Sequence, residues 1–589
     1  MSKRQIFPRT STLRNRWHRL IEAQRLRMAY VDALPQLALL GVVSGLLSGA
    51  IIILFRLVVD IGAETLFPMD TSEAYESISP LWRFVIAVVG GLVVGILFQL
   101  INVGSRHVGV VHVIERLNYH QGHLPLRNAT MQFAGAALSI VFGHSVGREG
   151  PNIHLGATSG SLLGQRLGLP NNSVRTLVGC GVAAAIAAGF NTPLAGVIFA
   201  MEVVLMEYTI IGFVPIILAA VSATALTRLV YGEEVLFIVS AQQWNTLDEF
   251  FYVLALGVTV GALAAAFIRL TLWISKLSSK LDIWVRLLLA GTFVGLIAVP
   301  VPQVMGIGYD TLNSTLLGEL AVLTLAMIVA GKLLATSACI GLGSPGGLIG
   351  PTLLIGAAAG GLLAEFATAT FGAGIFSSSY AIFGMGAMMA ATLQAPLAAL
   401  LALLEMTADP NLIMPGMIAV VSAVLVTRVV FRCPSIYQLA LQSQGLDYHN
   451  DPVSQTLRRI GIVRAMDRKF ARAPVNISRA EAITLLRQSP HWVLVSDGDD
   501  VVALLLAADL DRYISDNRED DAIDLLEIPA TRKDVSRANI VASLHDALQL
   551  LNKSGKEALY ITGAKGRGLQ RVYGVLTKED IERSYHVKR

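Results

Sequence analysis

The chain has 589 residues, 54% of them hydrophobic and only 15% charged, and its mean hydropathy is +0.60. A soluble globular protein carries about 25% charged residues, so this composition excludes an ordinary soluble fold for most of the chain. The net charge of +4 indicates no particular partner. Three widely separated cysteines without a CxxC pair predict neither a disulfide framework nor a metal site.

The first 30 residues form a basic segment. Residues 3–27 contain eight Lys or Arg and a single acid, Glu22. Basic residues next to membrane segments stay in the cytoplasm, so a cytoplasmic N-terminus is predicted for residues 1–30. Nucleic-acid binding by this segment is an alternative, but orientation explains the charge more economically. A cleavable signal peptide is not expected, because no small-residue cleavage site follows a short apolar core.

Long uncharged segments follow. The segments 37–55, 84–104 and 251–267 contain no charged residue, and each has about the length that spans a hydrocarbon core. We therefore expect a polytopic membrane domain over residues 31–445 and a soluble domain after about residue 455. Inside the apolar segments, small residues are frequent, which favours close approach of helices in lipid.

The membrane part contains an internal repeat. The segment GREGPNIHLGATSGSLLG (147–164) resembles SPGGLIGPTLLIGAAAGGLLA (344–364), and in each a Gly and a Pro open a helix rich in small residues. Pro151 and Pro351 suit the first turn of these helices, where the missing N–H group is no loss.

A second pair of similar segments follows in the same order. FNTPLAGVIFAMEV (190–203) resembles LQAPLAALLALLEM (393–406), and in both a glutamate, Glu202 or Glu405, lies nine residues after the proline. Duplicated halves with interrupted helices are typical of transporters, whose half-helix N-termini meet near the middle of the bilayer. Such termini offer unpaired N–H groups and the positive end of a dipole, which favour an anion.

These motifs resemble those of the CLC family of chloride channels and chloride/proton antiporters. GREGP at 147–151 is similar to the most specific motif of that family, GGLIGP (346–351) to its GxFxP motif, and PSIYQLAL (434–441) to the segment with its pore tyrosine. The resemblance covers nearly the whole membrane part. It implies a homodimer with one pore per subunit.

The resemblance also implies roles for individual residues. Glu149 would be the gating glutamate, whose carboxylate occupies the outer anion site until it is protonated or displaced. The N–H groups of Leu348 and Ile349 would face the central anion, with the Tyr437 hydroxyl as a further donor. The residues that would shape the surrounding loops or the local potential are Gly147, Arg148, Gly150, Pro151, Gly347 and Pro351. A mere helix-capping acid is the alternative for Glu149.

The sequence departs from the family in the segment that aligns with GSGIP and reads HVGVVHV (107–113). Val108 replaces the serine that donates to the central anion, and Val111 replaces the proline. Val108 and Gly109 would then line an inner anion site with one hydroxyl donor fewer, which should weaken or alter anion selectivity. Ile349 replaces the phenylalanine of GxFxP and keeps only its N–H donor.

A third departure bears on the mechanism. Family antiporters commonly carry a proton-accepting glutamate directly after the position of Glu202, and here that residue is Val203. Glu207 lies four residues later and shares the face of Val203 if the helix continues. Otherwise it is an interfacial carboxylate. Glu202 and Glu207 are therefore the candidates for a proton relay, and Val203 favours a channel over an antiporter without deciding between them.

Other ionisable residues lie near the expected pathway. His112, His144 and His154 are either pH sensors or hydrogen-bonding partners of neighbouring backbone. Lys332, in an apolar segment, either raises the potential of the pore for anions or satisfies helix-end carbonyl groups. An intramembrane hydrolase is the alternative from another class, but the sequence contains no HExxH motif and no evident aspartyl pair.

The soluble tail contains two similar units, predicted at 455–525 and 526–589. Residues 492–514 and 558–584 both read as strand, turn, strand and helix, and each stretch follows an amphipathic helix. The units resemble a tandem CBS pair, a module that often binds adenine nucleotides.

The two units differ at the signature that would bind the ribose. The second unit has Thr577 and Asp580, a hydroxyl and a carboxylate three residues apart at a strand-to-helix turn. The first unit keeps Asp509 but has Leu506 at the threonine position. The CBS pair is therefore expected either to bind an adenine nucleotide weakly or to serve only as a structural clamp in the dimer.

The sequence thus predicts an all-α polytopic membrane protein with an inverted repeat of broken helices, similar to the CLC fold, and an α+β cytoplasmic tandem CBS domain. The expected function is transport of chloride or a similar monovalent anion, as a gated passive channel in preference to a proton-coupled antiporter. A homodimer in the lipid bilayer of a prokaryotic plasma membrane is expected, with both termini cytoplasmic. No enzymatic activity and no nucleic-acid partner are predicted.

Overall fold

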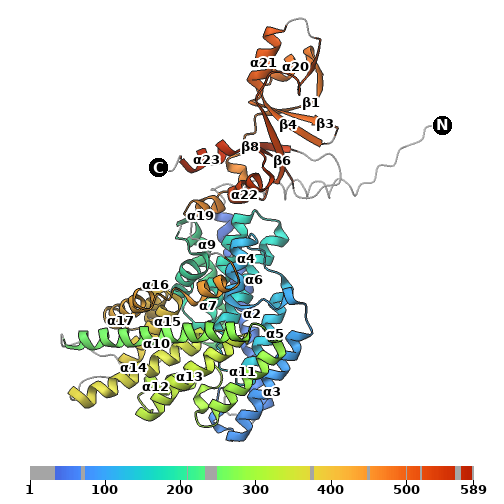
Figure 1. The fold of residues 1–589 in the computed structure, drawn as a ribbon. Coiled ribbons are helices and arrows are strands. Elements are labelled where there is room, and N and C mark those ends of the chain that lie inside the picture. Colours follow the sequence, from blue (N-terminus) through green and yellow to red (C-terminus); the bar gives the residue numbers. More distant parts are fainter. Residues whose placement is uncertain are drawn as a thin grey trace. The chain divides into compact units, whose positions relative to one another are not determined.

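The computed structural model describes residues 34–67, 73–208, 210–232, 248–371, 377–446, 452–498, 500–517, 521–563 and 572–586 (Figure 1). The predicted basic segment at 1–30 lies outside these residues. The chain divides into two compact units. One is helical and comprises Gln36–Arg166 and Val174–Tyr448, and the other is mixed and includes His449–Arg589.

The helical unit is built from two successive series of helices. The first series is α2 (Leu34–Leu66), α3 (Pro80–Gln99), α4 (Gly109–Tyr119), α5 (Leu126–Val141), α6 (Glu149–Leu167), α7 (Asn171–Phe190), α8 (Pro193–Phe199) and α9 (Ile210–Tyr231). The second series is α10 (Asp248–Ser278), α11 (Ile283–Ala298), α12 (Tyr309–Leu316), α13 (Val322–Leu342), α14 (Ile349–Phe371), α15 (Ser377–Leu393), α16 (Pro396–Thr407), α17 (Ile413–Leu425) and α18 (Ile436–Ser443).

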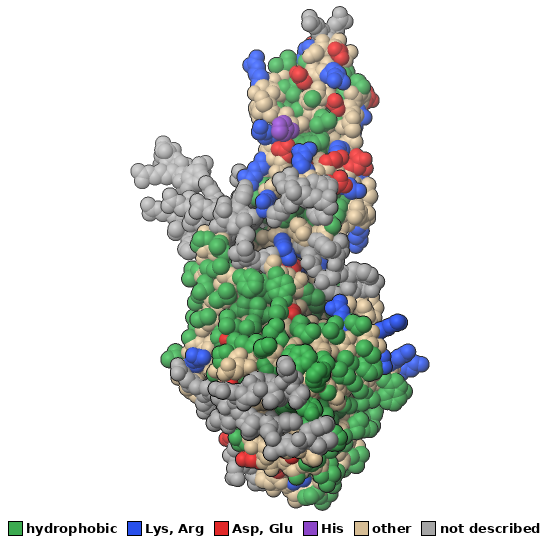
Figure 2. Space-filling model, turned by 90° about the vertical axis from the view of Figure 1, so that its left-hand side faces the viewer, with side chains coloured by type: hydrophobic (Ala, Val, Ile, Leu, Met, Phe, Trp, Pro, Cys, Tyr) green, Lys and Arg blue, Asp and Glu red, His purple; other side chains and the backbone are tan. Residues whose placement is uncertain are grey.

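Among the described residues, eight helices are long and apolar enough to cross a membrane. The predicted segments 37–55 and 251–267 lie within α2 and α10. The third predicted segment, 84–104, extends too far, because α3 ends at Gln99 and a short 3-10 turn follows at Val103–Ser105. Hydrophobic side chains cover much of the visible surface of this unit, whereas charged side chains are frequent on the mixed unit (Figure 2).

The internal repeat is visible in how equivalent helices pack. A Cβ atom at Gly156 of α6 would lie 2.2 Å from the carbonyl oxygen of Gly181 in α7. In the second half, a Cβ atom at Gly356 of α14 would lie 2.2 Å from the carbonyl oxygen of Gly384 in α15. Only glycine permits either contact, so the small residues in the sequence mark the same close helix crossing in both halves.

The mixed unit begins with α19 (Pro452–Arg459) and contains a six-stranded sheet in the order β1-β3-β4-β6-β7-β8. Its strands are β1 (Phe470–Pro474), β3 (Trp492–Asp497), β4 (Asp500–Leu506), β6 (Arg532–Asn539), β7 (Ala558–Thr562) and β8 (Val572–Thr577). A separate pair is formed by β2 (Asn476–Ser478) and β5 (Ala522–Asp524). The helices are α20 (Arg479–Leu486), α21 (Ala507–Asp516), α22 (Leu544–Ser554) and α23 (Lys578–His586).

The two halves of this sheet have the same pairing pattern. In the first half β1 pairs in parallel with β3, and β3 pairs antiparallel with β4. In the second half β6 pairs in parallel with β7, and β7 pairs antiparallel with β8. Each half has its own apolar core, one including Val495 and Leu510 and the other including Leu559 and Leu576. The expected order of strand, turn, strand and helix is present in both halves.

Candidate functional site

The two repeat loops are joined to each other by their backbones. The N–H of Gly147 donates to the carbonyl oxygen of Gly347 at 2.7 Å, and the N–H of Gly347 donates to the carbonyl oxygen of Gly147 at 2.6 Å. A Cβ atom at Gly347 would lie 2.5 Å from the backbone nitrogen of Gly150. The glycines predicted to shape these loops therefore allow α6 and α14 to begin side by side. Pro151 and Pro351 each occupy the third position of their helix, in the first turn as predicted.

The carboxylate of Glu149 lies at the N-terminus of the other half-helix. Its Oε2 accepts the N–H of Gly350 in α14 at 3.1 Å, and its Oε1 accepts a hydrogen bond from the Tyr309 hydroxyl of α12. The residue is only 1% exposed. A Cβ atom at Gly147 would lie 2.2 Å from Oε2, so this position is open to the carboxylate because Gly147 has no side chain. The carboxylate thus occupies the place where a helix N-terminus would hold an anion.

Arg148 is buried beside the carboxylate. Its guanidinium carbon lies 5.1 Å from the centroid of the Tyr309 ring. The side chain also lines a small cavity that includes Arg56, Asn152 and Tyr231. A buried arginine in contact with an aromatic face adds positive potential next to the Glu149 position.

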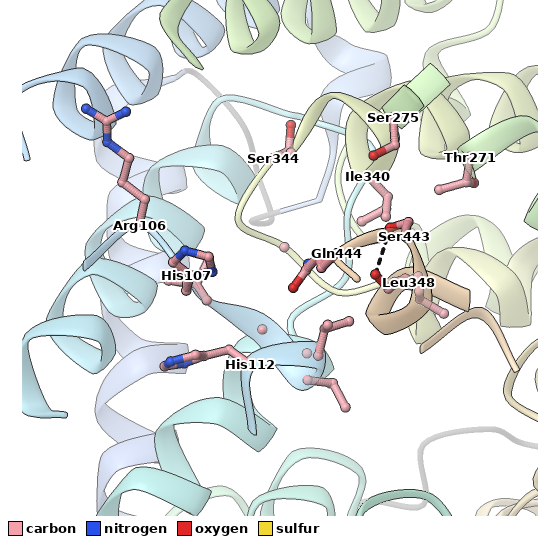
Figure 3. A pocket seen from close by; sticks show the side chains of 18 of the residues that line it. Arg106, His107, His112, Thr271, Ser275, Ile340, Ser344, Leu348, Ser443 and Gln444 are labelled. Atoms are coloured by element: carbon pink, nitrogen blue, oxygen red, sulfur yellow. Dashed lines mark hydrogen bonds between the residues drawn. The ribbon is translucent and has the colours of Figure 1, made fainter. Parts of the chain in front are cut away.

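A cavity of about 510 Å³, here called the inner cavity, is lined in part by the start of α14, including Leu348 (Figure 3). The predicted site residues that line it are Val108, Gly109, Gly150, Gly347, Leu348 and Tyr437. The charged residues Arg106 and Arg286 line it as well, with Glu115 and Asp282. Ile349 is fully buried. The sequence therefore identified residues from α4, α14 and α18 that the fold brings around one cavity.

The N-terminus of α4 is tied to the second repeat by a residue that the sequence analysis did not single out. The N–H of Gly109 donates to Oε1 of Gln132 at 2.6 Å, and Nε2 of Gln132 donates to the carbonyl oxygen of Pro345 at 2.9 Å. Gln132 is fully buried in α5. An amide in an apolar membrane helix is costly unless it has partners, and that rule was the available signal for this residue.

Glu202 and Glu405, the matched glutamates of the repeat, cap each other's neighbouring helices. The carboxylate of Glu202 accepts the N–H groups of Leu397 (3.3 Å) and Ala398 (2.7 Å) at the start of α16. The carboxylate of Glu405 accepts the N–H groups of Leu194 (2.9 Å) and Ala195 (2.8 Å) at the start of α8. Each negative charge therefore lies at the positive end of a helix dipole.

Glu207 does not share a helix face with Val203. Residues Ala200–Leu205 form a π-helical turn, and Met206 has a left-handed backbone with φ of 53°, so the helix ends before Glu207. The Glu207 carboxylate instead forms an ion pair with Arg175 at 3.1 Å. The condition for a face shared with Val203, a helix that continues to Glu207, is therefore not met, because the π-helical turn ends at the left-handed Met206.

The buried histidines and Lys332 have protein partners. His112 Nδ1 and His154 Nε2 lie 2.9 Å apart, whereas His144 Nε2 lies 3.2 Å from the carbonyl oxygen of Ala87. Lys332 Nζ donates to the carbonyl oxygens of residues 304, 305 and 306, at 3.2, 3.4 and 2.9 Å. Of the two roles considered for Lys332, this geometry matches the one in which it satisfies carbonyl groups.

In the mixed unit, Thr577 and Asp580 form a capping box at the start of α23. The N–H and the hydroxyl of Thr577 both donate to Oδ2 of Asp580, at 3.0 and 2.8 Å. The N–H of Asp580 donates back to the threonine hydroxyl oxygen at 3.2 Å. In the first half, Asp509 accepts the N–H of Thr531 at 3.2 Å. The contacts between Thr577 and Asp580 are those of a helix cap, whereas the Asp509 contact joins the start of α21 to the segment before β6.

The fold and the site define a class of protein: a membrane protein of two repeats in which two broken helices begin side by side. A model of the family "Voltage gated chloride channel" matches residues 90–428, and the chain belongs to that family. It is accordingly a chloride channel or transporter and not an enzyme, which removes the hydrolase alternative.

Individual relatives include proteins named as channels and proteins named as exchangers. The chain is 33% identical over 373 residues to a putative chloride channel protein ClcB-like of Ralstonia nicotianae, covering 62% of this chain and 86% of that protein. It is 28% identical over 418 residues to an H(+)/Cl(-) exchange transporter ClcA of Vibrio campbellii, covering 68% and 88%.

Two solved structures have a similar fold. The X-ray structure of a slow cyanobacterial Cl⁻/H⁺ antiporter matches with a TM-score of 0.61 and 26% identity, over 70% of this chain and 98% of that chain. A eukaryotic CLC transporter matches with a TM-score of 0.61 and 20% identity, over 94% and 99%, which extends the similarity of fold into the mixed unit.

Proposed function

We propose that the protein conducts chloride through a pathway that joins the inner cavity to the opposite side of the paired loops, with Glu149 as its gate. The observation that carries this proposal is the carboxylate of Glu149 at the N-terminus of α14. There it occupies a position that suits an anion, held by the N–H of Gly350. When the carboxylate is protonated it loses its charge, and a chloride ion can take its place at the helix N-terminus.

Residues around the inner cavity would hold the ion on its way to the gate. The backbone of Leu348 and Ile349 begins α14, and Tyr437 adds a hydroxyl on the wall of the cavity. Val108 and Gly109 contribute less to this site, because Val108 has no hydroxyl and the N–H of Gly109 already donates to Gln132. Neutral donors of this kind bind a singly charged anion without trapping it.

Passive conduction is favoured over exchange because both candidate proton acceptors are engaged by other groups of the protein. Glu202 caps α16, and Glu207 pairs with Arg175, so both carboxylates have structural partners. Val203 cannot carry a proton. Proton-coupled antiport is the second candidate, because a protonatable gate and a 28% identical exchange transporter both favour it.

The reversal potential separates the two candidates. Purified protein in proteoliposomes is measured under a fixed chloride gradient, first without and then with a pH gradient. For a channel, the potential follows the chloride gradient alone. A displacement of the potential by the pH gradient would show coupled exchange. In chloride-efflux measurements on the same proteoliposomes, Glu149→Gln should remove the dependence of flux on pH, and a flux that keeps the wild-type pH profile would show that Glu149 is not the gate.

We further infer that the mixed unit is a CBS pair and that the protein is a homodimer with cytoplasmic termini in a prokaryotic plasma membrane. The duplicated strand pairing of the mixed unit supports the first inference. The resemblance in sequence supports the dimer, and the basic residues of 3–27 support the orientation. Light scattering of the detergent-solubilised protein tests the dimer, and a monomer mass would contradict it. The capping of α23 favours a structural role for the tail, so added ATP should leave the thermal midpoint unchanged.

A further inference from the structure

Tyr309 contacts the Glu149 carboxylate from α12, an element other than the half-helices α6 and α14. It is the first residue of α12, and its hydroxyl donates to Oε1 of Glu149 while Gly350 donates to Oε2. Each carboxylate oxygen therefore has its own donor. One donor is a backbone group fixed by the fold of α14, and the other is a side chain that a single substitution can remove.

The backbone of Tyr309 is fixed by hydrogen bonds to Glu73. Oε2 of Glu73 accepts the N–H groups of Gly308 at 3.1 Å and of Tyr309 at 2.6 Å, which caps the start of α12. Gly308 has a φ of 92°, a conformation that favours glycine. Just before it, Lys332 Nζ binds the carbonyl oxygen of Gly306 at 2.9 Å.

The aromatic ring of Tyr309 is packed as well. Its centroid lies 6.3 Å from that of Phe190 and 5.1 Å from the guanidinium carbon of Arg148. The tyrosine is 9% exposed. Because both its backbone and its ring are fixed, the carboxylate is the partner that must move when the two separate.

We propose that Tyr309 is a positioning residue of the gate, whose hydrogen bond holds the ionised Glu149 carboxylate in the closed position. The proposal rests on the proposed role of Glu149 as the gate. The titratable and charged groups around this pair are Asp60, Glu73, Arg148, Asp310, Lys332 and Tyr437. None of these six donates a side-chain hydrogen bond to the Glu149 carboxylate; within the described part of the chain, Tyr309 is the only side chain that does.

The direction of the effect follows from the charge. A phenol hydroxyl stabilises an ionised carboxylate more than a protonated one, because hydrogen bonds to charged acceptors are the stronger kind. Loss of the hydroxyl should therefore make Glu149 easier to protonate and easier for chloride to displace. Both changes open the gate, so flux rises and half-maximal activation moves to higher pH.

The test is chloride efflux from proteoliposomes as a function of pH, with full-length Tyr309→Phe compared with the wild type. We expect half-maximal activation to move upward by about one pH unit and flux at alkaline pH to rise about tenfold, as for loss of one hydrogen bond to a charged group. The matched control is Tyr75→Phe. Tyr75 is also buried, at 2% exposed, but its hydroxyl donates to the carbonyl oxygen of Ile140 and not to the gate.

The double variant Tyr309→Phe/Glu149→Gln distinguishes a failure of the role proposed for Tyr309 from a failure of the proposed role of Glu149 as the gate. If Tyr309 acts through Glu149, the tyrosine substitution should change nothing in the Glu149→Gln background. The proposal is overturned if Tyr309→Phe keeps the wild-type pH profile, if Tyr75→Phe shifts it equally, or if the shift persists without the carboxylate. If Glu149→Gln alone keeps the wild-type pH dependence, the gate assignment itself fails. Tyr309→Leu, which also lacks the hydroxyl, replaces Tyr309→Phe if the latter is not monodisperse.

Discussion

The half-helices α6 and α14 begin with the same backbone and opposite chemistry. GREGP starts α6 and GLIGP starts α14, so Arg148 and Glu149 correspond to Leu348 and Ile349. The repeat supplies two equivalent helix N-termini, whose N–H groups favour an anion, and one of the two carries a negative charge. That charge does not cap its own helix alone, since it accepts a hydrogen bond from the N-terminus of the other. Symmetry of the backbone thus brings the two helix ends together, and the asymmetry of two side chains is the basis of the gate proposed at Glu149.

The largest effect is expected from a substitution that forces the N-termini of α6 and α14 apart. In Gly347→Ala, the new Cβ would lie 2.5 Å from the nitrogen of Gly150 and 3.0 Å from the carbonyl oxygen of Gly147. Both are backbone atoms that cannot rotate away, so the paired hydrogen bonds must lengthen or break. We expect a cost of about 3 kcal/mol or more and loss of monodisperse protein. Size-exclusion chromatography and the thermal midpoint measure it.

Gly104→Ala is the matched control for that substitution, because no heavy atom lies within 4 Å of its added Cβ. It should keep the wild-type elution and midpoint. A Gly347→Ala protein as stable as Gly104→Ala would show that the two loops are not held as closely as their distances indicate.

A smaller effect is expected at the second pair of equivalent residues, Glu202 and Glu405. The test is whether their two carboxylates contribute equally to stability, as their similar hydrogen bonds suggest. Glu202→Gln and Glu405→Gln each remove a negative charge from a helix N-terminus and leave one acceptor oxygen for two N–H groups. We expect each to cost about 1–2 kcal/mol, and the two costs to be similar. Thermal midpoints of the two variants give the comparison.

The same two variants also bear on transport. If Glu202 serves only as a cap, chloride efflux from proteoliposomes keeps its pH profile in both. A loss of pH-gradient-driven transport in Glu202→Gln, but not in Glu405→Gln, would make Glu202 a proton acceptor and break the symmetry.

Which parts of this site the sequence could predict depends on whether the residues lie in the duplicated motifs. Glu149, Gly147 and Gly347 lie in recognisable repeats, so both their positions and their pairing could be predicted. Tyr309 could not, because α12 lies outside the two pairs of similar segments and no motif relates it to Glu149. No spacing in a sequence indicates such a contact.

Local backbone detail was the other obstacle. Only a regular helix would place Glu207 on the face of Val203, and the π-helical turn before Glu207 changes which residues share a face. Hydrophobic periodicity does not distinguish a π turn from an α turn over six residues. In the mixed unit, by contrast, short strands and capped helices follow local sequence signals, and the order of elements was predicted correctly.

The smallest effect is expected at a third helix N-terminus, that of α4, which can be compared with those of α6 and α14. Val108 is the residue before α4, has an extended backbone and lines the inner cavity. Val108→Ser places a hydroxyl there, and this hydroxyl can donate to an anion in the cavity. Because one such hydrogen bond contributes about 0.5–1.5 kcal/mol, chloride affinity should rise by about 2- to 10-fold in equilibrium titrations of the purified protein. Val103→Ser is the control, since Val103 lines the same cavity but is 67% exposed, and it should leave the affinity unchanged. An unchanged affinity in Val108→Ser as well would mean that the ion binds to α14 and Tyr437 alone, out of reach of α4.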